Sequence, residues 1–462
     1  LLAQQMWDEA AKELARGKGR QGVAEGEDLY HHGLALLQSG RGDLPAAELS
    51  ALRALHLNPG DPQYGALVGE IYDRRGSPAL AISAFEQALA SPGMTPTAPM
   101  LRSLGGLYRK VERYDEARDS YLRAAAVDST YTPALRDLAD LLRAAKRYDQ
   151  AARTYLRCAV LDPGDVGAHL GVALCCLELR HYSQAAASAA AARALDPQRE
   201  DATFLYARAA LHGDDAARAA AAALMAEMPT PPAGYAWAVD DYTALADWLA
   251  GQKRFDEAAA ALASAAALDP ADPNVPFQTG IVALRRGNAA TAADHFRAAI
   301  ALNPETPAFH LNLGIALYQS SHFDEAIPSF RRALELNPDL TVGRLLLAQT
   351  LASRDDVAGA EAEYRRVLEA EPQNAKAQRG LGFCLLRRAD YAGAAEAYRA
   401  ATTLDPDNAD GWAGLGSAEL GRERLDAAEA AFGRARRLDP DNAMLEKGAA
   451  ILDQARKQAS GR

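Results

Sequence analysis

The chain has 462 residues, of which 24% are charged, and a formal net charge of −11 at pH 7. This acidic balance argues against a nucleic-acid groove as the main function, because phosphate neutralisation needs a clustered excess of Lys and Arg. Good helix formers such as Ala, Leu, Arg and Glu dominate, and no apolar run is long enough to span a bilayer. We therefore expect a soluble α-helical protein with no membrane insertion by this sequence.

The first 27 residues differ from the rest of the chain. Residues 1–14 can form a helix with Trp7 and Leu14 on one side, and the Gly-rich stretch after it predicts a flexible linker. This part is expected to cap the array that follows or to be the stub of a tether. Because the chain begins at Leu1, an upstream signal peptide or anchor is not visible. We expect a cytoplasmic location, with a periplasmic or membrane-tethered one left open.

From residue 28 onward, one unit of 34 residues recurs. Its end is marked by a proline at a fixed spacing, at Pro163, Pro197, Pro231, Pro270, Pro304, Pro338, Pro372, Pro406 and Pro440. The longer steps are the 39 residues from Pro231 to Pro270 and a step of 36 residues after Pro59. This period predicts about twelve copies of one structural unit, each of which contacts only its neighbours.

Residues 305–338 illustrate the unit. Apolar positions predict two helices joined by a short polar turn, and Pro338 ends the second helix because it lacks an amide donor and disfavours helical geometry before it. Gly314 of the first helix and Ala326 of the second are expected to face each other, which lets the two backbones approach closely. Phe330 is expected to fill the space between hairpins.

The same pattern of a small residue, an alanine, an aromatic residue and a second small residue recurs along residues 28–440. Clear copies are Gly69, Ala81, Phe85 and Ala88; Gly105, Ala117, Tyr121 and Ala124; Ala139, Ala151, Tyr155 and Cys158; Gly280, Ala292, Phe296 and Ala299; Gly382, Ala394, Tyr398 and Ala401; and Gly416, Ala428, Phe432 and Ala435. With the period and the terminal proline, this pattern resembles the tetratricopeptide repeat family. The resemblance implies an all-α, right-handed α-solenoid superhelix of about twelve helix-turn-helix hairpins.

The array has one interruption. Residues 28–231 hold repeats one to six and residues 241–440 hold repeats seven to twelve, with the Pro- and aromatic-rich residues 232–240 between them. This segment is interpreted either as a hinge or as an ordered insertion. Residues 441–462 predict one helix without a second partner, which the resemblance identifies as the C-terminal capping helix.

The resemblance places the concave face on the first helix of each hairpin. In two neighbouring units this helix carries a second stripe of large apolar residues, which the hairpin core does not need. The stripes are Phe277, Ile281 and Leu284 in one unit and Leu311, Ile315 and Tyr318 in the next. We expect a partner to bind there, because a monomer seldom leaves such an area exposed. The alternative is that these side chains complete the core. A similar but weaker set is Leu170, Leu174, Leu177 and Phe204.

Repeats three and four carry a basic stripe in the same position. Its residues are Arg102, Arg109 and Lys110, followed by Arg136 and Arg143. Arginine can hold a peptide carboxylate with bidentate geometry, as related scaffolds do with Lys and Asn. Asp140 lies between Arg136 and Arg143 and would repel an acidic ligand, so the alternative is a solvated face with local salt bridges.

Motifs for catalysis and metal binding are poor. Residues 17–22 satisfy a GxGxxG spacing without a preceding strand, and residues 41–43 form an Arg-Gly-Asp string where a turn is expected anyway. The four cysteines have no CxxC spacing and are expected to be buried thiols; they are Cys158, Cys175, Cys176 and Cys384. We expect a non-enzymatic protein without a cofactor or a metal site.

The resulting hypothesis is a non-catalytic scaffold that binds a protein or peptide partner in the concave groove. The Ala- and Arg-rich composition is typical of a bacterial protein. Two alternatives stay open. One is a non-catalytic subunit or recognition arm of a larger enzyme or secretion assembly, of the glycosyltransferase or polysaccharide-export type. The other is a self-assembling scaffold, so a homo-oligomer is possible.

Overall fold

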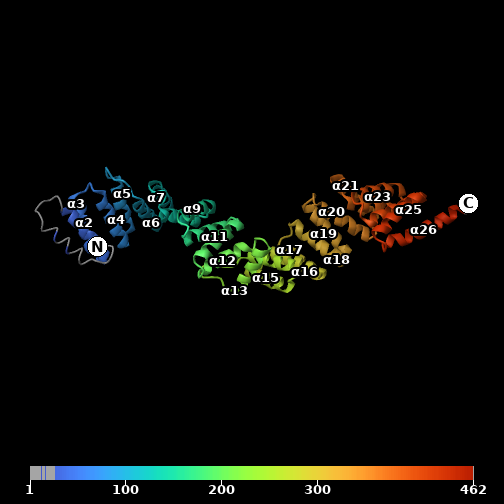
Figure 1. Ribbon diagram of the computed structural model, residues 1–462, viewed down its shortest axis with the longest axis horizontal. Helices are drawn as coiled ribbons and strands as arrows, with labels where there is room; N and C mark the ends of the chain where they lie inside the picture. The colour runs from blue at the N-terminus through green and yellow to red at the C-terminus, as the bar shows by residue number, and fades with distance from the viewer. Residues whose placement is uncertain (1–11, 13–15, 17–26, 461–462) are drawn as a thin grey trace. The chain divides into compact units, whose positions relative to one another are not determined.

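The computed structural model describes residues 12, 16 and 27–460, and within them the ordered elements are helices joined by turns. Consecutive helices pair into twelve hairpins, α2 with α3 through α24 with α25, and a single helix, α26, follows the last hairpin. Within each compact unit, the hairpins follow one another in chain order (Figure 1). The all-α solenoid is thereby confirmed. The helix and linker predicted for residues 1–26 lie outside the described residues.

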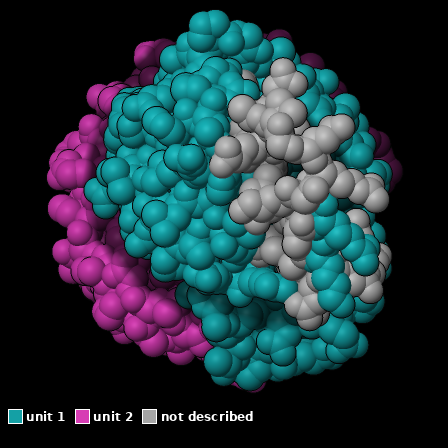
Figure 2. All heavy atoms as spheres, turned by 90° about the vertical axis from the view of Figure 1, so that its left-hand side faces the viewer, with its two compact units in different colours: residues 1–236 teal, residues 237–462 magenta. Residues whose placement is uncertain are grey.

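Contacts divide the chain into two compact units, residues 1–236 and residues 237–462, which Figure 2 colours separately. The first unit contains α2 (Glu27–Arg41), α3 (Leu44–Leu57), α4 (Pro62–Arg74), α5 (Pro78–Ala90), α6 (Ala98–Lys110), α7 (Tyr114–Val127), α8 (Thr132–Ala144), α9 (Tyr148–Leu161), α10 (Val166–Glu178), α11 (Tyr182–Leu195), α12 (Glu200–Ala210) and α13 (Asp215–Glu227). The second contains α14 (Val239–Gly251), α15 (Phe255–Leu268), α16 (Asn274–Arg286), α17 (Ala289–Leu302), α18 (Pro307–Gln319), α19 (Phe323–Leu336), α20 (Thr341–Ser353), α21 (Val357–Ala370), α22 (Ala375–Arg387), α23 (Tyr391–Leu404), α24 (Ala409–Gly421), α25 (Leu425–Leu438) and α26 (Ala443–Ser460).

The second helix of each hairpin ends as the sequence predicts. In α19 the backbone leaves the helical region at Asn337, with φ −141° and ψ 93°, because Pro338 disfavours the helical conformation of the residue before it. The first turn of the same helix carries Asp324 and Glu325, whose negative charges favour a helix N-terminus. Local sequence therefore sets where this helix begins and ends.

A residue in the left-handed conformation closes the turn inside most hairpins. It lies just after the first helix, and its φ is between 58° and 64° at Glu112, Lys146, Arg180, Lys253, Ser321, Asp355, Ala389 and Glu423. Gly287 occupies the same register with φ 91°. For residues with a Cβ this conformation costs about 1–2 kcal/mol, so the packing of the hairpin must supply that free energy.

The closest contact inside a hairpin joins a glycine to an aromatic ring. A Cβ built on Gly314 would lie 2.6 Å from the ring of Phe330, which is fully buried. The same juxtaposition, at 2.6–2.9 Å, recurs for Gly69 with Phe85, Gly105 with Tyr121, Gly280 with Phe296, Gly382 with Tyr398 and Gly416 with Phe432. The ring of Phe330 therefore lies closest to Gly314, inside its own hairpin, and the facing of Gly314 and Ala326 stays a prediction.

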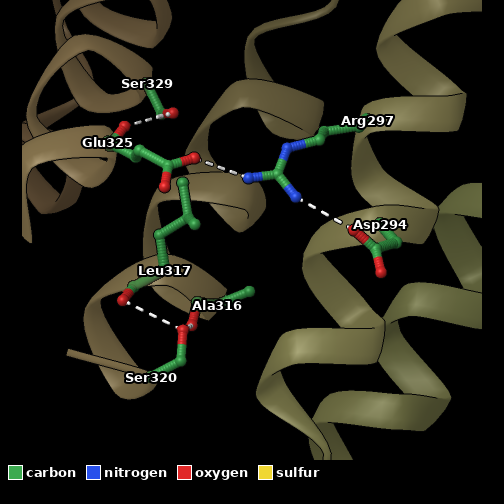
Figure 3. Close-up of polar contacts among 7 residues, drawn as sticks. All are labelled: Asp294, Arg297, Ala316, Leu317, Ser320, Glu325 and Ser329. Carbon is green, nitrogen blue, oxygen red and sulfur yellow. Dashed lines mark hydrogen bonds and ion pairs between the residues drawn. The ribbon is translucent and has the colours of Figure 1, made fainter. Parts of the chain in front are cut away.

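Ion pairs link the second helices of neighbouring hairpins. Arg297 of α17 contacts Asp294 of its own helix at 3.0 Å and Glu325 of α19 at 2.7 Å (Figure 3). Because these groups are about half exposed, each pair contributes less than about 1 kcal/mol. Such exposed pairs therefore add little to stability, whereas fully buried rings such as Phe330 contribute more.

The segment between the two six-hairpin parts is anchored by its aromatic residues. The ring of Tyr235 lies 5.4 Å from the ring of Phe204, centroid to centroid, and Trp237 is buried. These contacts favour the ordered insertion of the two alternatives for this segment. Whether it also acts as a hinge stays a prediction.

The four cysteines are buried as free thiols, as expected. Burial raises the pKa of Cys158, Cys175 and Cys384 to about 11, so these thiols stay protonated and unreactive at neutral pH. Across the described part of the chain, no group of three or more His, Cys, Asp or Glu residues is placed to hold a metal ion. None of the helices there has the length and apolar character that crossing a bilayer requires.

Two adjacent glycines in α6 test the glycine–ring contact. A Cβ on Gly105 would lie 2.7 Å from the Tyr121 ring, whereas a Cβ on Gly106 would meet only the Tyr121 hydroxyl at 3.9 Å. Gly105→Ala should therefore lower the free energy of unfolding by ~1–3 kcal/mol through overpacking. Gly106→Ala should raise it by up to ~1 kcal/mol, because alanine favours the helix. Denaturant titration of both variants measures these free energies of unfolding. Equal changes in the two variants would contradict the contact between Gly105 and the Tyr121 ring.

Candidate functional site

The first helices form one surface of each unit. Within each unit, the first helix of a hairpin contacts the first helix of the next hairpin, as α16 contacts α18 and α18 contacts α20. The second helices instead contact the first helices on either side of them. Each unit is thus more closely packed on the side of its first helices, and we call this side the inner surface.

The predicted apolar stripes lie together on the inner surface of the second unit. All six side chains are half-buried and pack against the hydrophobic core; they are Phe277, Ile281, Leu284, Leu311, Ile315 and Tyr318. The Phe277 ring lies 4.9 Å from the ring of Phe309 in the next hairpin, between centroids. The side chains thus support the core with one part and stay accessible with another. Their role in partner binding stays a prediction.

The apolar stripe extends further than the sequence analysis proposed. Leu345 of α20 occupies the register of Leu311 one repeat later, and Phe383 of α22 occupies that of Ile315 two repeats later. Both side chains are half-buried against the same core. The 34-residue period applied to Leu311 and Ile315 would have found them. We call the half-buried apolar side chains of the first helices α16, α18, α20 and α22 the apolar inner surface.

The weaker set in the first unit needs correction. Leu170 is 5% exposed and Phe204 is fully buried, so neither is available to a partner, while Leu174 and Leu177 are half-buried. Phe204 is covered in part by Tyr235 from the segment that follows the sixth hairpin. The sequence pattern could not show this cover, because the contact depends on how that segment folds back.

Most of the basic stripe is neutralised by neighbouring acids. Arg102 donates to Asp137 of the next hairpin at 2.6 Å, and this hydrogen bond raises the pKa of Arg102. Lys110 pairs with Asp73 at 2.6 Å. Arg136 pairs with Asp165, a buried carboxylate that also accepts the amide of Ala168 at the start of α10. These three cations therefore act within the protein, in line with the local salt bridges that the sequence analysis left as the alternative.

Arg143 and Arg109 have different environments. The Nε of Arg143 donates to the hydroxyl of Tyr155 at 3.4 Å, and that hydroxyl donates to Asp140. Arg109 is exposed, and among the described residues it makes no ion pair. Asp140 is thus held by Tyr155 and Arg143. The predicted basic groove reduces to one cation, Arg109, that has no acidic partner.

The fold and the repeat pattern agree with comparisons to known proteins. Tetratricopeptide repeat sequences match residues 30–99, 102–166, 277–340, 345–409 and 385–443, which together are more than half of the chain. The chain belongs to the tetratricopeptide repeat family. The matched residues include hairpins of both units, whereas residues 167–276 lie outside the matches. In sequence, the chain matches no curated protein.

Solved structures with tetratricopeptide repeats resemble the chain at low identity. The Cut9–Hcn1 hetero-tetramer of the APC/C has 16% identity and a TM-score of 0.39, covering 96% of this chain and 98% of that chain. PilW, a widely conserved type IV pilus biogenesis factor, has 19% identity and a TM-score of 0.40, covering 45% and 97%. Yeast Tom70 has 16% identity and a TM-score of 0.34, covering 86% and 96%. Resemblance at this level carries no argument about function.

Truncating two phenylalanines distinguishes the core from the inner surface. Phe330→Ala should lower the free energy of unfolding by ~3–5 kcal/mol, because its ring is fully buried. Phe277→Ala should cost about half as much, because its ring is half-buried. The difference is measured as the shift of the denaturation midpoint of each variant. Equal shifts would place Phe277 in the core.

Proposed function

We propose that this tetratricopeptide repeat protein is a non-catalytic interaction scaffold whose apolar inner surface binds a peptide segment of a protein partner. The observation that carries the proposal is the run of half-buried Leu, Ile, Phe and Tyr side chains across α16, α18, α20 and α22. The hairpin cores beneath are filled by other side chains, such as Leu317 and Phe330. The exposed parts of the stripe are therefore available to a partner.

The first unit supplies an example of the ligand chemistry. Phe204 of α12 has the same place in its repeat as Phe277 of α16, seven residues after the preceding proline. The ring that packs on Phe204 is that of Tyr235, from a Pro-rich segment outside the helices. By analogy, an extended segment with aromatic or bulky aliphatic side chains fits the apolar inner surface.

Polar groups in the stripe suit an extended backbone. Gln349 of α20 occupies the register of Ile315 and is half-buried, and its amide can both donate to and accept from a peptide group. Buried peptide groups need such partners, since an unpaired one costs about 1–3 kcal/mol. Apolar side chains would supply the affinity, and Gln349 would orient the backbone.

A pair of double variants tests the proposal. Leu311→Ser with Ile315→Ser removes two apolar contacts of the inner surface and should weaken partner capture by more than about tenfold, with helicity unchanged. Leu156→Ser with Val160→Ser is the matched control, because these side chains are 44% and 71% exposed on α9, a second helix. Pull-down from native lysate identifies the partner, and titration of that partner gives the affinities. The proposal would be contradicted if the Leu311→Ser, Ile315→Ser variant still captures the partner and the Leu156→Ser, Val160→Ser variant does not.

A further inference from the structure

The fourth hairpin holds a carboxylate on the inner surface of the first unit. The hydroxyl of the buried Tyr155 of α9 donates to the carboxylate of Asp140 on α8. Arg143, one turn further along α8, donates to the same hydroxyl at 3.4 Å and lies 3.9 Å from Asp140. A tyrosine of the second helix and an arginine of the first helix thus hold one carboxylate between them.

The third hairpin repeats this arrangement without the carboxylate. In the sequence, Tyr121, Arg109 and Gly106 stand one repeat of 34 residues before Tyr155, Arg143 and Asp140. Gly106 therefore takes the place of the aspartate and offers no acceptor. The Tyr121 hydroxyl is buried, and the described residues give it no hydrogen-bond partner.

The geometry leaves room over Gly106. A Cβ built there would have the Tyr121 hydroxyl, at 3.9 Å, as its nearest neighbour outside the backbone of its own helix, so an acceptor that takes the place of the missing side chain can reach the hydroxyl from this side. Burial raises the pKa of Tyr121 to about 12, so the hydroxyl keeps its proton at neutral pH and can donate. A buried hydroxyl without an acceptor is unfavourable, and an incoming acceptor removes that cost.

One cation near this position is available to an anion. Four charged groups influence the pKa of the Tyr121 hydroxyl: Asp137, Arg109, Arg102 and Asp140. Asp137 is paired with Arg102, and Asp140 is held by Tyr155. Arg109 is exposed and makes no ion pair within the described chain, so its side chain can turn toward a ligand. An arginine and a hydroxyl are donors that suit a carboxylate.

We infer that Tyr121 and Arg109 form a carboxylate-binding site over Gly106 on the inner surface of the third hairpin. The site takes a carboxylate from a peptide ligand, in the way that Tyr155 and Arg143 take Asp140. It rests on the proposed function only in that its natural ligand is a peptide. It lies in the first unit and does not use the apolar inner surface of α16–α22.

NMR of the full chain labelled with ¹³C at Cζ of tyrosine tests the site, since a hydroxyl that gains an acceptor shifts its own Cζ signal. Tyr121→Phe assigns the signal. The probes are N-acetylaspartate N-methylamide, for a side-chain carboxylate, and N-acetylglycine, for a chain terminus, with sodium chloride at equal ionic strength as the control. A saturable shift of the Tyr121 signal with either carboxylate is expected. The probe that binds more tightly shows whether the site prefers a side-chain carboxylate or a chain terminus. No shift, or an equal shift with chloride, would overturn the inference.

Substitution of Gly106 gives a test that needs no ligand. Gly106→Asp supplies the carboxylate from within, so it should move the Tyr121 signal and abolish the response to the probes. Gly106→Asn, of the same size without the charge, should leave part of the response. Adding Tyr121→Phe should lower the melting temperature more in the Gly106→Asp background than in the wild type. Equal effects in both backgrounds would contradict the site.

The two proposals can fail separately. Leu311→Ser with Ile315→Ser should leave the Tyr121 titration unchanged, because those residues belong to the second unit. Arg109→Gln should weaken the titration several-fold while the helicity of the chain stays the same. A titration that is insensitive to Arg109→Gln would remove Arg109 from the site.

Discussion

The structure depends on the contact, found in six of the twelve described hairpins, between an aromatic ring of the second helix and a glycine of the first helix. Because the ring lies where a Cβ would be, as with Gly314 and Phe330, the two helices of a hairpin have one favourable register. The buried rings also bring consecutive hairpins together, since Tyr398 lies against Gly382 of its own hairpin and Gly414 of the next. Repetition of this contact makes an array in which each hairpin depends on its neighbours.

This dependence leaves the inner surface free to vary. The core positions are taken by small residues and rings, so the stripe on the inner surface of each first helix carries a smaller share of the packing. In α16 and α18 the stripe is apolar, whereas in α6 and α8 it is charged and tied by ion pairs such as Arg102 with Asp137. The same scaffold can therefore present different chemistry along its length, and function is read from these stripes.

The hairpins and their approximate number could be predicted from sequence, because the period, the prolines and the aromatic residues each encode a local constraint. The contact of Gly314 with Phe330 could not be predicted, since the sequence pattern placed this ring in the space between hairpins. The burial of Phe204 depends on Tyr235, which a separate segment brings back onto α12. The environment of Arg109 could not be predicted either. It depends on which acid each cation reaches across hairpins, and this requires side-chain positions.

Photo-crosslinking tests the central claim, that a peptide segment lies along the apolar inner surface, most directly. A benzophenone amino acid is placed in turn at Ile281, Ile315 and Gln349 on three consecutive first helices, and at Leu156 on an outer helix as the control. The account predicts crosslinks at the three inner positions to successive residues of one short partner segment, and none at Leu156. Crosslinks from Leu156 alone, or inner crosslinks scattered over unrelated parts of the partner, would contradict it.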